Sequence, residues 1–269
     1  MALTGLAVSR ATRSGTSRTS GWVIVQRNFI VYRSAWMIFL TGFLEPVLYL
    51  FSIGVGVGQL IEDFQFNGRA VQYAAFVAPG MLAASAMNGA ILDSTFGIFF
   101  KLKYHNVYDG VLATPMRTVD IARGELIWSL LRSAAYSGGF VVVMAVMGLV
   151  ESWWAILAWP ATWLTGFAFA GVGMALTTFM RSWQDFEYIQ LAIIPMFLFS
   201  ATFFPITAFD GVLRWVVELT PLYRSVVLCR ELTTGLLTFE SVISVGYLAA
   251  MGLVGLSIAS RRLDRLLLK

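Results

Sequence analysis

Long apolar runs restrict the folds open to this sequence more than any other feature. Several runs approach or exceed the roughly 20 residues that a helix needs to cross a bilayer. The chain is 58% hydrophobic and 13% charged, with a mean hydropathy of +0.75, whereas soluble domains carry roughly 25% charged residues. A membrane β-barrel would show alternating segments of about ten residues instead. The sequence therefore predicts an all-α, polytopic membrane protein.

Six spans account for the apolar runs, and one domain of residues 35–260 contains them all. The predicted spans are residues 35–58, 73–100, 126–150, 153–180, 186–204 and 241–260. Residues 1–20 are rich in Ser, Thr and Arg and lack the apolar core of a signal peptide, so we expect a disordered cytoplasmic tail. Residues 261–269 form a second, basic tail.

The positions of lysine and arginine predict the orientation, because cytoplasmic segments carry more of them. With the N-terminus inside, fourteen lie in inside segments, four lie outside, and Arg132 falls within a span. Both termini and the loop after the second span are then cytoplasmic. The net charge of +4 does not indicate a nucleic-acid partner, since the basic residues gather at span ends.

Two amphipathic segments lie outside the spans. Residues 21–34 place Gln26 and Arg27 on one stripe, which is typical of a helix lying in the membrane interface. The alternative is a simple extension of the first span. Residues 205–236, broken at Pro205 and Pro221, are too short to span, and we expect one or two short helices that re-enter the outer leaflet.

Charged residues inside spans are functional candidates, because burying them in lipid is unfavourable. Glu45, directly before Pro46, either lines a substrate path or ties the first span to a neighbour. Asp93 and Arg132 lie at similar depths in consecutive spans, so we predict an ion pair between them, mainly structural. Glu125 is expected near the start of the third span, where a carboxylate favours a helix N-terminus.

Several kinds of chemistry are excluded. None of the three lysines follows a glycine, so the chain has no P-loop for ATP. One histidine and one cysteine, His105 and Cys229, rule out a histidine cluster, an internal disulfide or a cysteine-rich metal site. Glycine repeats at residues 54–58 and 171–173 are typical of closely packed membrane helices. We expect neither an enzyme nor a cofactor in this chain.

Three blocks of sequence resemble the permease of the ABC transporter type-2 family. These are "EPVLYLFSIGVGVG" at 45–58, "YDGVLATPM" followed by "DIARGEL" at 108–126, and "FFPITAFDGVLRWVVELTPLYRSVVLCREL" at 203–232. The likeness is greatest to nodulation lipo-oligosaccharide exporters and actinobacterial drug exporters, and it covers nearly all of the chain after residue 21. One departure is Asp210-Gly211, where many relatives have Leu-Pro.

The resemblance implies contact surfaces for a separate ATPase subunit. A coupling helix at about residues 104–113, ended by Thr114-Pro115, would dock on the ATPase. The implied coupling-helix contacts are Tyr104, His105, Tyr108, Asp109 and Leu112. Further contacts would come from Arg27, Arg181 and Asp185. Apart from the resemblance, the aromatic side chains of Phe199, Phe203 and Phe204 are typical of contacts with lipid or a neighbouring helix, and the alternative is that they line a lateral opening.

The implied function is the transmembrane part of an ATP-driven exporter in the bacterial inner membrane. Two permeases, identical or sister chains, would move a lipid, glycolipid or hydrophobic drug outward, while ATP and Mg²⁺ bind the partner ATPase. The alternatives are an ion-coupled carrier or channel, for which Glu45 is the one candidate residue, and a membrane-embedded enzyme, for which no motif is present.

Overall fold

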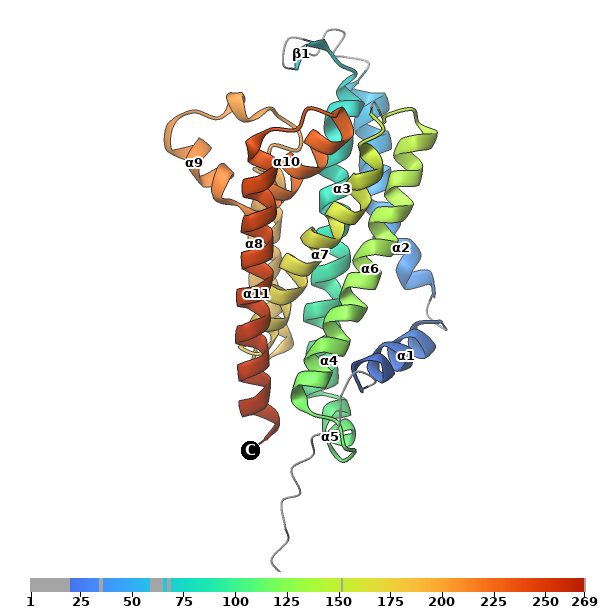
Figure 1. The fold of residues 1–269 in the computed structure, drawn as a ribbon, viewed down its shortest axis with the longest axis vertical. Coiled ribbons are helices and arrows are strands. Elements are labelled where there is room, and N and C mark those ends of the chain that lie inside the picture. The colour runs from blue at the N-terminus through green and yellow to red at the C-terminus, as the bar shows by residue number, and fades with distance from the viewer. Residues whose placement is uncertain (1–19, 34–35, 59–64, 67–68, 151, 269) are drawn as a thin grey trace, which may run out of the picture.

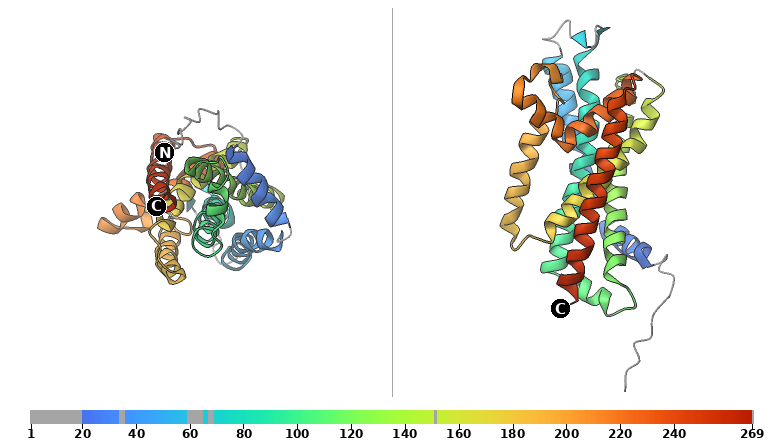
Figure 2. Two further views of the ribbon diagram at one scale, coloured as in Figure 1. Left: turned by 90° about the horizontal axis from the view of Figure 1, so that it is seen from below. Right: turned by 60° about the vertical axis from the view of Figure 1, so that its left-hand side comes forward.

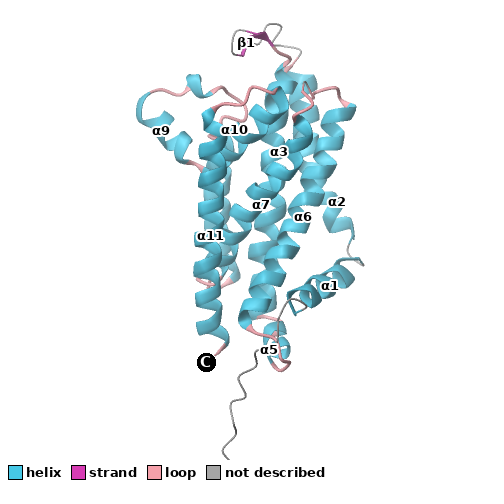
Figure 3. Cartoon of the chain, viewed as in Figure 1, coloured by secondary structure: helices cyan, strands magenta, loops and turns pink. Residues whose placement is uncertain are grey.

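The computed structural model describes residues 20–33, 36–58, 65–66, 69–150 and 152–268. Almost all regular structure in these ranges is helical (Figure 3), as the sequence predicts. The helices are α1 (Ser20–Arg33), α2 (Trp36–Ser52), α3 (Tyr73–Leu92), α4 (Ile98–Lys103), α5 (Val107–Leu112), α6 (Thr118–Val146), α7 (Ala155–Thr177), α8 (Phe186–Leu198), α9 (Gly211–Leu219), α10 (Pro221–Thr234) and α11 (Phe239–Leu267).

Short irregular elements complete the chain. π-helical turns follow α2 at Ile53–Val57 and join α3 to α4 at Asp93–Gly97, and 3₁₀ turns lie at Trp183–Asp185 and Ile206–Ala208. The strands β1 (Gln65–Phe66) and β2 (Arg69–Ala70) form a two-residue antiparallel pair. The predicted tail of residues 1–20 lies outside the described residues except for Ser20.

Four helical segments of the described chain are long and apolar enough to cross a membrane. They are Tyr73–Lys103, Thr118–Val146, Ala155–Thr177 and Phe239–Leu267, and they coincide with the second, third, fourth and sixth predicted spans. The helix of the third predicted span, α6, begins at Thr118, eight residues earlier than expected. The helices in the other two predicted spans are shorter, with 17 residues in α2 and 13 in α8.

The helices form an elongated bundle with two distinct ends (Figure 1). α5, the end of α11 and the oblique helix α1 lie at the lower end, which we call the α5 end. β1, α9 and α10 lie at the opposite end. α1 crosses the outside of the bundle at an angle to α2, so it does not extend the first predicted span.

Glycines permit a close helix contact between α7 and α11. A Cβ atom at Gly171 would lie 2.6 Å from the carbonyl oxygen of Gly252, and one at Gly255 would lie 2.5 Å from the carbonyl carbon of Gly171. Such distances leave no room for a side chain. The glycine repeat at 171–173 is therefore a packing feature, as its sequence pattern indicates.

Gly255→Ala is expected to destabilise the protein by about 1–3 kcal/mol, because the added methyl group meets the backbone of α7 rather than a movable side chain. Gly246→Ala is the matched control in the same helix, since no atom lies within 4 Å of its added Cβ. It should be neutral or stabilising by up to about 1 kcal/mol, owing to the better helix propensity of alanine. Thermal unfolding in detergent measures both, and equal midpoints would contradict the packing role.

α10 closes the end of the bundle opposite α5. The side chain of Thr220 caps the helix by accepting a hydrogen bond from the backbone N–H of Tyr223, and Pro221 follows at the first helical position, where its missing N–H does no harm. The guanidinium group of Arg230 donates hydrogen bonds to the carbonyls of Ala201 at 2.8 Å and Phe76 at 3.3 Å. These bonds fix α10 to α3. The helices α9 and α10, which meet at Pro221, match the one or two short helices expected in residues 205–236.

The Asp210-Gly211 departure changes the turn before α9. Gly211 has a φ of +59°, a conformation that is open to glycine but not to proline, whose ring fixes φ near −65°. The turn here therefore differs from one built on Leu-Pro.

Cys229 is completely buried in α10 and packs as a small apolar side chain. Burial raises the pKa of its thiol to about 12, so the reactive thiolate is scarce at neutral pH. We expect the native protein to resist maleimide labelling and to label fully once it is denatured in dodecyl sulfate. Rapid native labelling, followed by mass spectrometry, would show that α10 detaches from the bundle.

Candidate functional site

The carboxylate of Glu125 is the centre of a buried polar cluster at the α5 end. It lies in α6 and is 1% exposed. Lys101 of α4 places its Nζ 2.6 Å from Oε2, Asn28 of α1 donates to Oε2 at 3.0 Å, and Tyr108 of α5 donates to Oε1 at 3.1 Å. One side chain thus joins four helices. Glu125 lies seven residues inside α6, so its expected place at a helix N-terminus is wrong.

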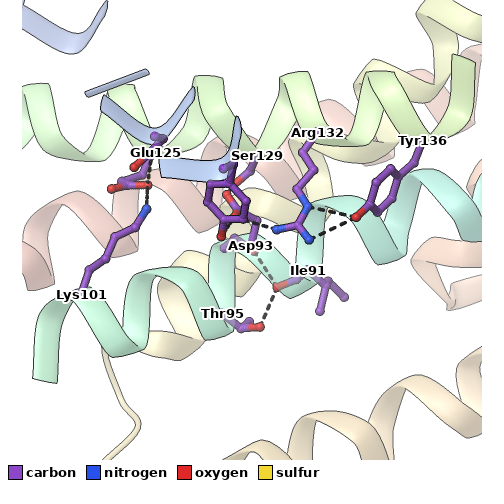
Figure 4. A network of polar contacts seen from close by, with 11 residues as sticks. Ile91, Asp93, Thr95, Lys101, Glu125, Ser129, Arg132 and Tyr136 are labelled. Carbon is purple, nitrogen blue, oxygen red and sulfur yellow. Dashed lines mark hydrogen bonds and ion pairs between the residues drawn. The ribbon is translucent and has the colours of Figure 1, made fainter. Parts of the chain in front are cut away.

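A second cluster is built around Asp93, where α3 gives way to the π-helical turn (Figure 4). Nη1 of Arg132 lies 3.1 Å from Oδ1 of Asp93, which confirms the predicted ion pair. Tyr32 of α1 and Ser129 of α6 each donate a hydrogen bond to the carboxylate at 3.1 Å. Tyr136 accepts two hydrogen bonds from Arg132, at 3.1 and 3.2 Å.

The two clusters together form what we call the buried polar network. In α6 its members are Glu125, Ser129, Arg132 and Tyr136, whose spacing places them on one helix face. In α1, Asn28 and Tyr32 are four residues apart and face the same way. The network contains two carboxylates and two cations, so its formal charges balance. Buried charges need such pairing and hydrogen bonding to be tolerated.

Burial also keeps the network tyrosines protonated. It raises the pKa of Tyr108 well above the ordinary tyrosine value, and the neighbouring carboxylate of Glu125 raises it further. The same causes act on Tyr32, where burial comes first and Asp93 second. Both phenols are therefore hydrogen-bond donors at any physiological pH.

The π-helical turn Asp93–Gly97 interrupts the long helix that carries Asp93 and Lys101. Thr95 satisfies the displaced carbonyl of Ile91 with a 2.6 Å hydrogen bond from its hydroxyl (Figure 4). π-helical turns mark functional sites in many helices. Here the turn separates the part of the helix inside the bundle from the part that leads to α5.

The coupling segment differs in two ways from its prediction. Its helix is α5, beginning at Val107 rather than Tyr104, because Asn106 adopts a left-handed conformation with φ of 47° that breaks the chain away from α4. Tyr108 is 2% exposed, so its expected role as a surface anchor is wrong: it fastens α5 to Glu125. Tyr104, His105 and Asp109 are exposed, and Leu112 is half-buried.

The other predicted contact residues also lie at the α5 end. Arg27 is half-buried in α1, and Arg181 is exposed between α7 and α8. Asp185 accepts hydrogen bonds from the backbone N–H groups of Arg181 at 2.6 Å and Ser182 at 3.2 Å, which lower the pKa of its carboxyl. Its side chain therefore shapes the turn before α8.

A groove of about 630 Å³ runs between α2, α3 and α8. Seen from below in Figure 2, α2 (blue) and α8 (light orange) lie on either side of α3 (teal). Glu45 and Phe203 line it, whereas Phe199 and Phe204 are exposed and do not. Phe197 takes their place, and its ring centroid lies 6.4 Å from that of Tyr49 across the groove.

Sequence reasoning missed most of the network around its charged pair. Lys101, Asn28 and Tyr32 were not predicted as partners. One signal was available, since Lys101 and Glu125 carry opposite charges near the facing ends of consecutive helices. The part played by α1 had no such signal.

Comparison with known proteins assigns the family. A family model described as ABC-2 type transporter matches residues 19–232. The chain belongs to the ABC-2 type transporter family. This confirms the resemblance found in the three sequence blocks, and it makes the chain a membrane transport subunit.

The relatives of this ABC-2 permease include nodulation protein J from several rhizobia. The protein from Rhizobium leguminosarum bv. trifolii is 32% identical over 254 residues, covering 92% of this chain and 94% of the relative. The one from Rhizobium meliloti (strain 1021) is 30% identical with the same coverage. The one from Neorhizobium galegae is 28% identical over 262 residues, covering 95% and 98%.

Proposed function

We propose that this chain is the permease of an ATP-driven exporter that moves a lipid, glycolipid or hydrophobic drug-like amphiphile outward across the bacterial inner membrane. ATP and Mg²⁺ bind a separate ABC ATPase. The observation that carries the proposal is the buried polar network, which connects the exposed helix α5 to α6 and α1. Family membership and the absence of a P-loop from the sequence both support ATP hydrolysis by a separate subunit.

In this proposal all six predicted spans cross the membrane, with both termini and the α5 end in the cytoplasm. α2 supplies the first span and α8 the fifth. The outer surface of α1 supports an interfacial position, since Trp22, Phe29 and Ile30 are each more than half exposed while Asn28 faces inward. Amphipathic helices lie in the headgroup region with such a face in the lipid.

Movement of the ATPase reaches the transmembrane helices through Glu125. Tyr108 fastens α5 to this carboxylate, and the same carboxylate holds α1 and α4. A displacement of α5 therefore moves three other helices together, since the same carboxylate bonds side chains of α1, α4 and α5. The π-helical turn at Asp93–Gly97 provides the place where the lower part of the long helix bends relative to the upper part.

The permease acts as a pair, either with itself or with a sister chain. The apolar side chains of Leu48, Tyr49 and Phe51 on α2 are each about half exposed. Together with the groove, they form a surface that a second permease and the substrate share. Membrane lipids cover the remaining apolar faces.

Co-purification in mild detergent with an ABC ATPase encoded by the same genome tests the proposal. Asp109→Lys reverses an exposed charge on α5 and should abolish the complex and its ATP hydrolysis, whereas Tyr104→Ala should weaken it. Asp210→Lys makes the same charge change at the opposite end and is the control. If no ATPase is recovered with well-folded permease, or if both charge reversals act alike, the proposal fails.

A further inference from the structure

The groove between α2, α3 and α8 contains a carboxylate with no protein partner in the described chain. Glu45 is exposed on α2, and no hydrogen bond or ion pair within the described residues involves its side chain. By contrast, Arg132 and two hydroxyl groups hold the carboxylate of Asp93. Lys101, the hydroxyl of Tyr108 and the amide of Asn28 hold that of Glu125. Among the described residues, the side chain of Glu45 thus differs from these two buried carboxylates in having no protein partner.

Such a position is unfavourable against lipid. A carboxylate at membrane depth faces water, a cation or a hydrogen-bond donor, because hydrocarbon solvates it poorly. Pro46 lies beside it and cannot donate a hydrogen bond to it. This carboxylate therefore indicates an occupant of the groove that supplies the cation or hydrogen-bond donor that the described chain lacks at this position.

The residues that line the groove indicate the charge and polarity of that occupant. Polar groups come from all three helices: Glu45 from α2, Asn88 from α3 and Gln190 from α8. Amides can donate and accept, but they add no charge, so the site as a whole is negative. Most of the remaining wall is apolar, with Met81, Met87, Ile91, Ile193, Ile194 and Phe197 among the lining residues.

An aromatic group bounds the groove away from the α5 end. The ring of Phe197 packs edge-on against that of Phe203 at 5.3 Å and faces Tyr49 at 6.4 Å. The hydroxyl of Tyr73 holds the backbone of Phe203 by a 2.9 Å hydrogen bond to its carbonyl. Aromatic faces attract cations as well as alkyl chains. These rings therefore add to the preference for a positively charged group that the carboxylate of Glu45 gives the groove.

We propose that the groove binds amphiphiles that carry a positively charged amino group, which pairs with Glu45 while the apolar chain lies along α3 and α8. Asn88 and Gln190 hydrogen-bond the neighbouring polar atoms of the ligand. Amphiphiles with an anionic group are rejected, because two negative charges would face each other where no cation of the described chain intervenes. The inference deepens the proposed export function and rests on it for the direction of transport.

Three matched probes test this selectivity on the purified full-length permease in neutral detergent, without ATPase. Each is a C12 alkyl chain that carries a photoactivatable diazirine and ends in a primary amine, a hydroxyl or a carboxylate. The amine probe should label peptides from α2, α3 and α8, with half-saturation at a concentration about tenfold lower than that of the other two. Mass spectrometry locates the labelled residues.

Substitution then assigns the preference to a residue. Glu45→Gln should reduce the preference for the amine to within about twofold, since the shape is kept and the charge is lost. Gln190→Leu should lower the amine affinity about fivefold, the effect of one hydrogen bond. Glu187→Gln, an exposed carboxylate on α8 outside the groove, is the matched control and should leave all three probes unchanged.

The wild-type comparison is decisive even if no variant folds, because equal labelling by the three probes overturns the proposal. Full amine preference in Glu45→Gln also overturns it. So does a change of oligomeric state in that variant with unchanged probe binding, which would place the carboxylate in an interface between copies. Loss of ATPase co-purification with an intact amine preference would instead overturn the export function alone.

Discussion

Glu125→Leu is expected to destabilise the protein by roughly 3–5 kcal/mol, the range seen when one partner of a buried ion pair is removed. The change leaves the ammonium group of Lys101 without its carboxylate and takes the acceptor from Tyr108 and Asn28. Burial prevents water from replacing these bonds, because Glu125 is 1% exposed. The expected result is a large fall in the thermal unfolding midpoint in detergent and loss of monodisperse protein.

Two further variants separate charge from shape at this position. Glu125→Gln keeps the size and one acceptor oxygen, so it should lower the free energy of unfolding by less, about 1–3 kcal/mol. Glu187→Leu removes an exposed carboxylate and should change stability by less than about 0.5 kcal/mol. If Glu125→Leu were as stable as the wild type, α5 would be held by packing alone, and the proposed transmission through Glu125 would lose its basis.

Asp93→Leu is expected to have a comparable effect, about 3–5 kcal/mol, because Arg132 loses its carboxylate while remaining 5% exposed. The double variant Asp93→Leu/Arg132→Leu removes both charges together. It should regain most of the lost stability, since apolar pairs of similar volume often replace buried ion pairs without loss. Unfolding midpoints of the wild type, Asp93→Leu, Arg132→Leu and the double variant form a double-mutant cycle.

An exposed ion pair provides the control for that cycle. Arg214 and Glu218 lie 2.9 Å apart on α9, but the arginine side chain is half exposed. Arg214→Ala should change stability by about 0–1 kcal/mol. A double variant of Asp93 and Arg132 that is no more stable than the single ones would show that the pair's hydrogen-bonding neighbours, rather than charge balance, hold the cluster together.

The sequence alone predicted the features that depend on local pattern. Apolar run length located the helices that span most of the bundle, because hydrophobic periodicity and length are properties of neighbouring residues. Pro221 located the break before α10, and the glycines at 171–173 indicated close packing. The ion pair of Asp93 and Arg132 could also be predicted, since consecutive spans are antiparallel and place similar depths side by side.

Tertiary structure decided which residues meet across helices that are distant in the sequence. Tyr108 reads as an exposed anchor in a polar loop, but the fold turns α5 so that its hydroxyl reaches Glu125, 17 residues away. Asn28 reaches the same carboxylate across 97 residues, and Phe197 rather than Phe199 or Phe204 faces the groove. These outcomes depend on the rotation and tilt of whole helices, which are set by the summed packing of many side chains rather than by any short stretch of sequence.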